Sequence, residues 1–113
     1  MEMVVTKLDD TVTCVRLHGR LDAPGADEIG VRFTAAVAAA GRDATIDLGG
    51  VTFLASMGLR LLISSARALK SRGKSMVMFG AQDLVLNVLE QSAIDQIIPI
   101  VGTEQQARER LSA

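Results

Sequence analysis

The sequence predicts an α/β fold: a single mixed, mostly parallel β-sheet opened by a β-hairpin, with interspersed α-helices in the order β-β-α-β-α-β-α-β-α. The chain begins with two runs rich in Val and Thr, joined by the turn-forming residues Asp9-Asp10-Thr11. Short apolar runs then alternate with segments whose apolar residues recur at helical spacing. The 113 residues leave room for one hydrophobic core, so we expect residues 1–113 to form a single domain.

The opening hairpin is expected to pair Met3–Leu8 with Val12–His18. Apolar and polar residues alternate in the second run, which places Val15 and Leu17 on one face of the sheet. Gly19 is expected to end this strand.

A first helix is predicted to begin at Asp22-Ala23-Pro24 and to end at Gly41. Asp22 can cap the free amides, and Pro24 fits a first turn in which no amide donor is needed. The apolar residues at helical spacing are Ala26, Ile29, Phe33, Val37 and Ala40.

A short strand, Ala44–Leu48, follows and is expected to end at Gly49-Gly50. From Met57 to Arg72 the helical periodicity is the clearest in the chain, and Gly73 ends this helix. Its apolar stripe consists of Leu59, Leu62, Ile63, Ala66 and Leu69. Its polar face consists of Arg60, Ser64, Arg67 and Ser71.

The continuously apolar run Met76–Phe79 indicates a strand that is covered on both faces. Ile97–Val101 is predicted as the last strand, at the sheet edge because Pro99 cannot donate a ladder hydrogen bond. The sequence Thr103-Glu104-Gln105-Gln106 is typical of a capping box and predicts a terminal helix that reaches Leu111. A third, shorter helix between the last two strands is marked by Leu84, Val85, Val88 and Leu89.

Composition excludes several classes of function. A net charge of −1 provides no field that would attract nucleic acid. The longest uncharged stretch, Leu48–Leu59, contains three glycines and is much shorter than the roughly 20 apolar residues of a membrane-spanning helix. Glu2 stands where a secretory signal carries positive charge, and the lone cysteine, Cys14, cannot form an internal disulfide. We therefore expect a cytoplasmic protein with no membrane insertion.

The reactive side chains do not assemble into a catalytic or metal site in the sequence. Cys14 and Arg20 have the spacing of cysteine-dependent phosphatases, but Cys14 lies inside an alternating strand where that chemistry needs a phosphate-binding loop. His18, expected at a strand end, has no second histidine with which to share a metal. The pair Asp9-Asp10 belongs to a hairpin turn, and Gly49-Gly50 lacks the lysine of a nucleotide-binding loop. We expect no enzyme activity, no cofactor and no metal.

Ser56 stands between an apolar run and the Met57–Arg72 helix and is expected to be the N-cap of that helix. An N-cap serine is exposed at one end of the sheet. A phosphate added there would be favoured by the helix dipole.

The segment from Asp47 to Leu59 resembles the signature of STAS domains, in particular the bacterial anti-sigma factor antagonists. The family pattern is an aspartate-leucine strand, a short loop and then Asp-Ser-Ser-Gly-Leu at the start of a helix. Leu17–Asp22 is similar to the family's Gly-x-Leu-Asp segment. Phe79-Gly80, and the last strand followed by Glu104–Ala107, occur in the family's order. The resemblance spans essentially the whole chain and implies a STAS-like fold.

This resemblance implies a function in partner switching. By it, Ser56 matches the serine that a kinase-type anti-sigma factor phosphorylates. The unphosphorylated antagonist binds this anti-sigma factor and frees the sigma factor, phosphorylation blocks the binding, and a PP2C-type phosphatase reverses the modification. The partner-binding residues are expected to be Asp22, Ser56, Met57, Gly58 and Arg60.

Two residues depart from the family pattern: Ala55 replaces its aspartate, and Met57 replaces its second serine. The alternative function is that of a non-phosphorylated STAS module, a cytoplasmic accessory subunit of a lipid or anion transporter. The partner, a soluble kinase or a transporter, distinguishes the two.

Overall fold

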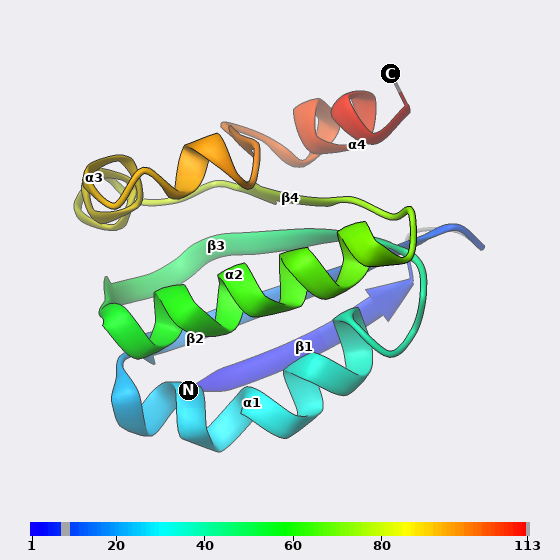
Figure 1. Ribbon diagram of the computed structural model, residues 1–113. Helices are drawn as coiled ribbons and strands as arrows, with labels where there is room; N and C mark the ends of the chain where they lie inside the picture. The colour runs from blue at the N-terminus through cyan, green and yellow to red at the C-terminus, as the bar shows by residue number, and fades with distance from the viewer. Residues whose placement is uncertain (8–9, 113) are drawn as a thin grey trace.

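The computed structural model describes residues 1–7 and 10–112, and within them the chain forms one five-stranded sheet with helices on both faces (Figure 1). The strands are adjacent in chain order, β1 (Glu2–Lys7), β2 (Val12–Leu21), β3 (Asp43–Leu54), β4 (Met76–Phe79) and β5 (Ile100–Val101). The helices are α1 (Ala23–Val37), α2 (Ser56–Ser71), α3 (Asp83–Gln91) and α4 (Glu104–Ser112). A short 3₁₀ helix, η1 (Ile94–Gln96), follows α3.

The predicted fold class is confirmed. β1 pairs with β2 in antiparallel orientation, and the other neighbouring strands pair in parallel. The expected hairpin is therefore present, although Leu8 and Asp9 of its predicted strand and turn lie outside the described residues.

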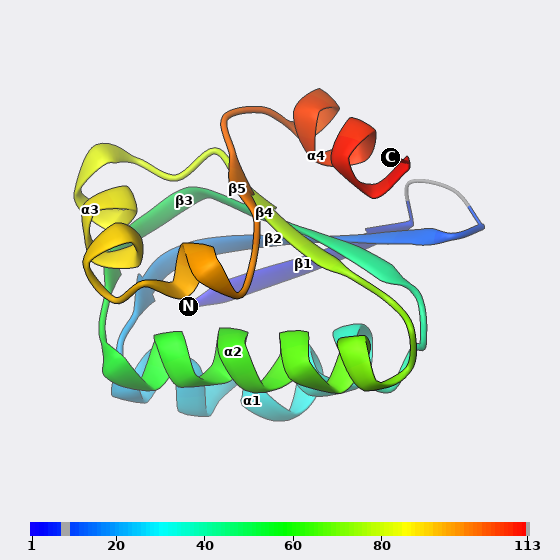
Figure 2. The same ribbon diagram turned by 45° about the horizontal axis from the view of Figure 1, so that its top comes forward.

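The helices cover the two faces of the sheet unequally. Figure 2 shows α1 and α2 side by side against one face, with α4 on the opposite side. Residues of α3, including Val85 and Leu89, belong to the same buried core as those of α1 and α2. A smaller cluster of Val77, Phe79 and Ala107 lies under α4, so β4 is covered on both faces as predicted.

The apolar stripe of α2 faces the main core, which α2 shares with α1 and α3. Leu62 and Leu69 are fully buried and Ala66 is buried, while Leu59 and Ile63 are half-buried. The side chains predicted for the opposite face, Arg60, Ser64, Arg67 and Ser71, are exposed.

Two strands are longer than predicted because pairing between them overrides the local preference of their glycines. β2 does not end at Gly19 but continues to Leu21, and Gly19 adopts a positive φ of 108° beside an irregularity in the register. β3 does not end at Gly49-Gly50 but runs on to Leu54, because β2 and β3 stay paired as far as Leu21 and Leu54. His18 consequently lies within β2 and not at its end.

The first helix is shorter than predicted. α1 ends at Val37, and Ala40 is exposed beyond it. The Arg72 guanidinium donates hydrogen bonds to the carbonyls of Ala38 and Ala39, at 3.0 and 3.1 Å, and so satisfies the groups that the end of the helix leaves free.

The C-terminal segment follows the prediction with one correction. The predicted strand Ile97–Val101 is reduced to Ile100–Val101, at the sheet edge after Pro99. η1 ends at Gln96, and Ile97 is its C-cap, so the chain is not yet extended at the predicted start of the strand. In α3, Val85 and Leu89 are buried, but Val88 is half-buried and Leu84 is exposed.

The predicted capping box at the start of α4 is present. The Gln106 amide donates to Thr103 Oγ1 at 3.2 Å, and the Thr103 amide donates to Gln106 Oε1 at 3.1 Å.

We predict that Leu62→Ala lowers the free energy of unfolding by about 2–5 kcal/mol, because it leaves a cavity under a side chain that has no exposed surface. Leu84→Ala is the matched control, since Leu84 is 61% exposed, and it should change stability by about 0.5 kcal/mol or less. Urea denaturation measures both, and equal effects would mean that the buried face of α2 is assigned wrongly.

Candidate functional site

The carboxyl ends of β2 and β3 bring two strand-to-helix junctions together. Leu21 pairs with Leu54 in the sheet, and the Ala55 amide donates a hydrogen bond to the Leu21 carbonyl at 3.1 Å. Asp22 follows Leu21 and Ser56 follows Ala55, so these two residues lie at the same edge of the sheet. The amino-terminal ends of α1 and α2 lie beside each other there (Figure 1).

Asp22 is the N-cap of α1, as predicted. Its Oδ1 accepts the Gly25 amide at 2.9 Å, and its Oδ2 accepts Arg20 Nε at 3.2 Å. The hydrogen bond from Gly25, with a further contribution from Arg20, lowers the pKa of the Asp22 carboxyl below its usual value. The Arg20 guanidinium also lies 4.3 Å from the centroid of the Phe53 ring. Asp22 thus orders the start of α1.

The prediction that Ser56 caps α2 is wrong by one residue. Ala55 occupies the N-cap position with an extended backbone, and its side chain cannot bond the first-turn amides. The bond from Ala55 to Leu21 holds Ala55 at the end of the sheet, so the helix begins at Ser56. The Ser56 side chain is exposed, and its hydroxyl makes no hydrogen bond within the described chain.

Gly58 lets α2 approach the end of β2. A Cβ atom at this position would stand 2.5 Å from the Leu21 carbonyl oxygen and 2.7 Å from Leu21 Cγ, closer than packing allows. Gly58 is buried by this contact. Its place at the junction is therefore beneath Ser56 and Met57, where it sets the position of the first turn.

A groove of about 690 Å³ runs between the amino-terminal halves of α1 and α2, and we call it the α1–α2 groove. Pro24 and Asp27 line one side, and Met57, Arg60 and Leu61 line the other. A second hollow, of about 550 Å³, follows the outer face of α2 from Ser56 through Arg60 to Arg67. Arg60 borders both.

The structure therefore brings Ser56, Met57 and Arg60 to one surface. Met57 is 43% exposed, which is the arrangement of an adaptable apolar contact. No hydrogen bond or ion pair joins Arg60 to any other described residue. Such a surface can bind another protein through an apolar side chain, a free cation and a serine open to modification.

The other reactive side chains stay apart from this edge. Cys14 is buried in β2, and burial raises the pKa of its thiol, which disfavours the reactive thiolate. No group of three or more potential metal ligands occurs in residues 1–7 and 10–112. Of the acidic pair, Asp10 is exposed, and Asp9 lies outside the described residues.

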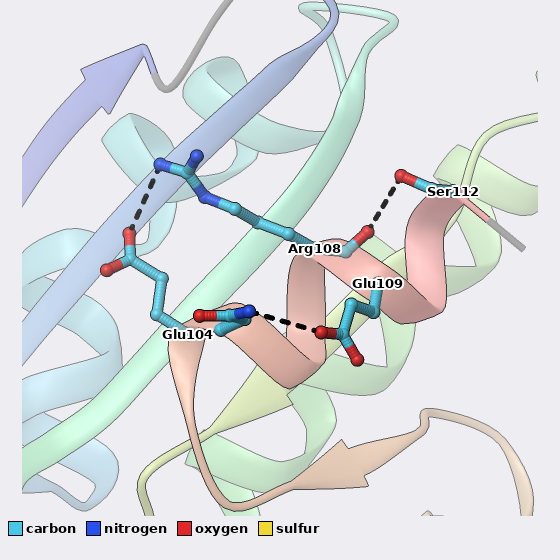
Figure 3. A pocket seen from close by; sticks show the side chains of 5 residues that line it. Glu104, Arg108, Glu109 and Ser112 are labelled. Atoms are coloured by element: carbon cyan, nitrogen blue, oxygen red, sulfur yellow. Dashed lines mark hydrogen bonds and ion pairs between the residues drawn. The ribbon is translucent and has the colours of Figure 1, made fainter.

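A further hollow, on the surface of α4, is lined by converging polar groups (Figure 3). Its side chains bond to one another along a single helix: Arg108 pairs with Glu104 at 3.8 Å, and Gln105 donates to Glu109 at 3.3 Å. The Ser112 hydroxyl donates to the Arg108 carbonyl at 3.0 Å. Because these groups satisfy one another, we assign the hollow no role in binding.

The sequence profile described as "Mlab, STAS domain" matches residues 4–101. This chain belongs to the STAS domain family. None of the helices in the described chain combines the length and apolar character needed to cross a bilayer.

Relatives of this STAS domain include BtrV of Bordetella bronchiseptica, named as a candidate anti-sigma factor antagonist. It is 24% identical over 95% of this chain and 91% of its own. The anti-sigma factor antagonist SpoIIAA in its unphosphorylated form shares the fold, with a TM-score of 0.81 and 19% identity over 98% of this chain and 96% of its own. The phosphorylated form, from Bacillus, gives a TM-score of 0.72, with 17% identity over 96% of this chain and 98% of its own.

The same fold occurs inside a transporter. The murine anion transporter Slc26a9 matches 97% of this STAS domain with a TM-score of 0.78 and 13% identity, although the match covers only 22% of the transporter chain.

No pattern in the sequence predicts which residues of α1 line the groove. Met57, Arg60, Leu61 and Ser64 share one face of α2 by helical spacing, and that signal was available. Which residues of α1 face them depends on how the two helices pack, and no local pattern of the sequence records that.

We predict that Gly58→Ala lowers the free energy of unfolding by about 1–3 kcal/mol, because the added methyl group collides with Leu21. Gly30→Ala, also within a helix, is the matched control. Its Cβ would meet no atom within 4 Å, so alanine should stabilise the chain by roughly 0.8–1.0 kcal/mol through its helix propensity. Chemical denaturation measures the free energy of unfolding of both variants. A decrease for Gly58→Ala with an increase for Gly30→Ala supports the close approach of α2 to β2, and equal stabilisation by both substitutions would contradict it.

We predict that Ala55→Asp stabilises the domain by about 0.5–2 kcal/mol, because an aspartate with this backbone conformation can accept a first-turn amide. Ser56→Ala should change stability by about 0.5 kcal/mol or less, since the hydroxyl has no partner in the described chain. Thermal and urea unfolding measure both. If Ser56→Ala lowered the free energy of unfolding by as much as the loss of an N-cap does, about 0.5–2 kcal/mol, the result would show that the Ser56 hydroxyl caps the helix.

Proposed function

We propose that this STAS domain is a cytoplasmic anti-sigma factor antagonist that acts by binding and not by catalysis. It binds an anti-sigma factor with serine kinase activity, and phosphorylation of Ser56 switches the binding off. A PP2C-type phosphatase reverses the modification, and the cycle regulates transcription that depends on the sigma factor. The observation that carries this proposal is the exposed, unbonded Ser56 hydroxyl at the start of α2, beside the α1–α2 groove.

Two comparisons support the sigma-regulatory role. BtrV bears the name of an antagonist and aligns with nearly the whole chain. SpoIIAA, an antagonist of the same fold, exists in phosphorylated and unphosphorylated forms. By the family resemblance of residues 47–59, Ser56 occupies the position of the modified serine.

The start of α2 can carry a phosphate without unfolding. The kinase would transfer the γ-phosphoryl group of ATP to Ser56 Oγ, taking up the hydroxyl proton and releasing ADP. Ser56 is exposed and the first turn has no side-chain cap, so its amides remain available to the new charge. Negative charge at a helix N-terminus is stabilised by about 0.3–1 kcal/mol.

The same phosphate would oppose binding. A partner that packs on Met57 and the α1–α2 groove would have to bury a doubly charged group against an apolar contact. Within the proposed partner surface, Ser56, Met57 and Arg60 make the contacts, while Asp22 and Gly58 hold the two helix starts in place. The switch therefore needs no change of fold.

The second candidate, an accessory subunit of a lipid or anion transporter, is supported by the likeness to the STAS segment of Slc26a9. Such a module would bind a transporter through the same kind of surface without a phosphorylation cycle. The identity of the bound partner separates the two functions.

We predict that incubation with the cognate anti-sigma kinase and ATP places one phosphate on Ser56. Ser56→Ala should stay folded and bind the kinase permanently, because it cannot be modified. Ser56→Asp should stay folded and bind poorly, because it brings negative charge to the contact. Peptide mapping by mass spectrometry and binding calorimetry are the measurements. Ser71→Ala, exposed at the far end of α2 and outside the groove, is the control. Phosphate on another residue, or none with an active kinase, would favour the transporter-type module.

A further inference from the structure

We propose that Arg60 is the intramolecular partner of phosphorylated Ser56, an inference that rests on the proposed function. The phosphate binds the Arg60 guanidinium on the same helix. Phosphorylation then acts twice: it adds negative charge to the docking surface, and it withdraws the cation that the surface offers to its partner.

The spacing of the two residues carries the first part of the argument. Ser56 and Arg60 are four residues apart on α2 and line the same hollow. Side chains at this spacing lie on one face of a helix, with Cβ atoms about 5–6 Å apart. The order is also the favourable one, because the negative group precedes the positive group and lies at the helix N-terminus, where the helix dipole stabilises it.

Arg60 is free to accept this role. Among the described residues several arginines are already engaged: Arg16 pairs with Asp47, Arg20 pairs with Asp22, and Arg72 binds carbonyls at the end of α1. Arg67, on the same helix as Arg60, has no such partner in the described chain. Arg60 has no such contact with any described residue. It can therefore turn to a phosphate without breaking an existing bond.

Arg67, the other cation of the hollow, is too far away to compete. It lies eleven residues beyond Ser56, which is roughly 16 Å along the helix axis. It is exposed on the same helix, and this makes it a matched control for general charge effects.

The residue before Ser56 favours the pairing. The first turn of α2 contains no acidic side chain, and Ala55 stands where the family pattern has an aspartate. An acidic group at position 55 would repel the phosphate and would itself attract Arg60. With alanine there, the phosphate is the negative charge nearest to Arg60 within that turn.

The test uses protein into which phosphoserine is incorporated at position 56 during translation, so that no kinase is needed. The phosphate is titrated by ³¹P NMR in three proteins: the unchanged chain, Arg60→Gln and Arg67→Gln. A nearby guanidinium favours the dianion. Loss of Arg60 should therefore raise the titration midpoint, which lies near pH 6 for a free phosphoserine, by roughly 0.2–0.4 pH units. Arg67→Gln should leave the midpoint unchanged.

Added salt should shrink the effect of Arg60→Gln, because both groups are exposed to solvent. Arg60→Lys keeps the positive charge and should retain part of the low midpoint. Equal midpoints in the unchanged chain and Arg60→Gln, or equal shifts for the two glutamine variants, would overturn the pairing.

The titration separates this inference from the proposed function. A low midpoint that depends on Arg60 supports the pairing even if no anti-sigma kinase modifies Ser56, and that second result would count against the proposed function alone. If a kinase does modify Ser56 but the phosphate titration midpoint is the same with and without Arg60, the proposed function is supported and the pairing is refuted.

Discussion

The parallel pairing of β2 with β3, carried as far as Leu21 and Leu54, is the constraint on which the candidate site depends. The hydrogen bond from the Ala55 amide to the Leu21 carbonyl extends this pairing by one residue. Both chain segments then turn into helices at the same edge, so Asp22 and Ser56 meet although they are far apart in sequence. Had either strand ended at its glycine, the two helix starts would be attached by loops, and their relative position would be loose.

Two glycines let the starts of α1 and α2 pack closely against the end of β2. Gly25 and Gly58 each stand where a Cβ atom would collide with the end of β2, with the Arg20 and Leu21 carbonyls respectively. The first turns of α1 and α2 can therefore rest directly on the strand end. The α1–α2 groove is a consequence, because two helices that start this close to one strand leave a narrow channel between their outer faces. Small residues beneath the surface thus determine the shape of the surface above them.

The sequence predicted the features that depend on local pattern. Helical spacing identified the buried face of α2, including Leu62 and Leu69, because burial on one side leaves a period of 3.6 residues. The lengths of β2 and β3 were missed, because Gly19 and Gly49 carry a local signal for a break and the pairing that opposes it is tertiary. The N-cap of α2 was placed one residue late for the same reason. The α1 side of the groove was beyond reach, since it depends on helix packing.

The start of α2 lacks a side-chain cap, and this locally unfavourable feature suits the proposed binding surface. Ala55 gives up the hydrogen bond that a capping aspartate would supply, and stability would favour the aspartate. In exchange, the amides of the first turn stay open, the Ser56 hydroxyl makes no hydrogen bond within the described chain, and the first turn itself holds no acidic side chain that would compete for Arg60. A sequence that departs from a local rule without compensation elsewhere in the fold points to selection for something other than stability. The departure falls on the residue next to the proposed phosphorylation site, where an open helix end and a free cation are of use to a phosphate.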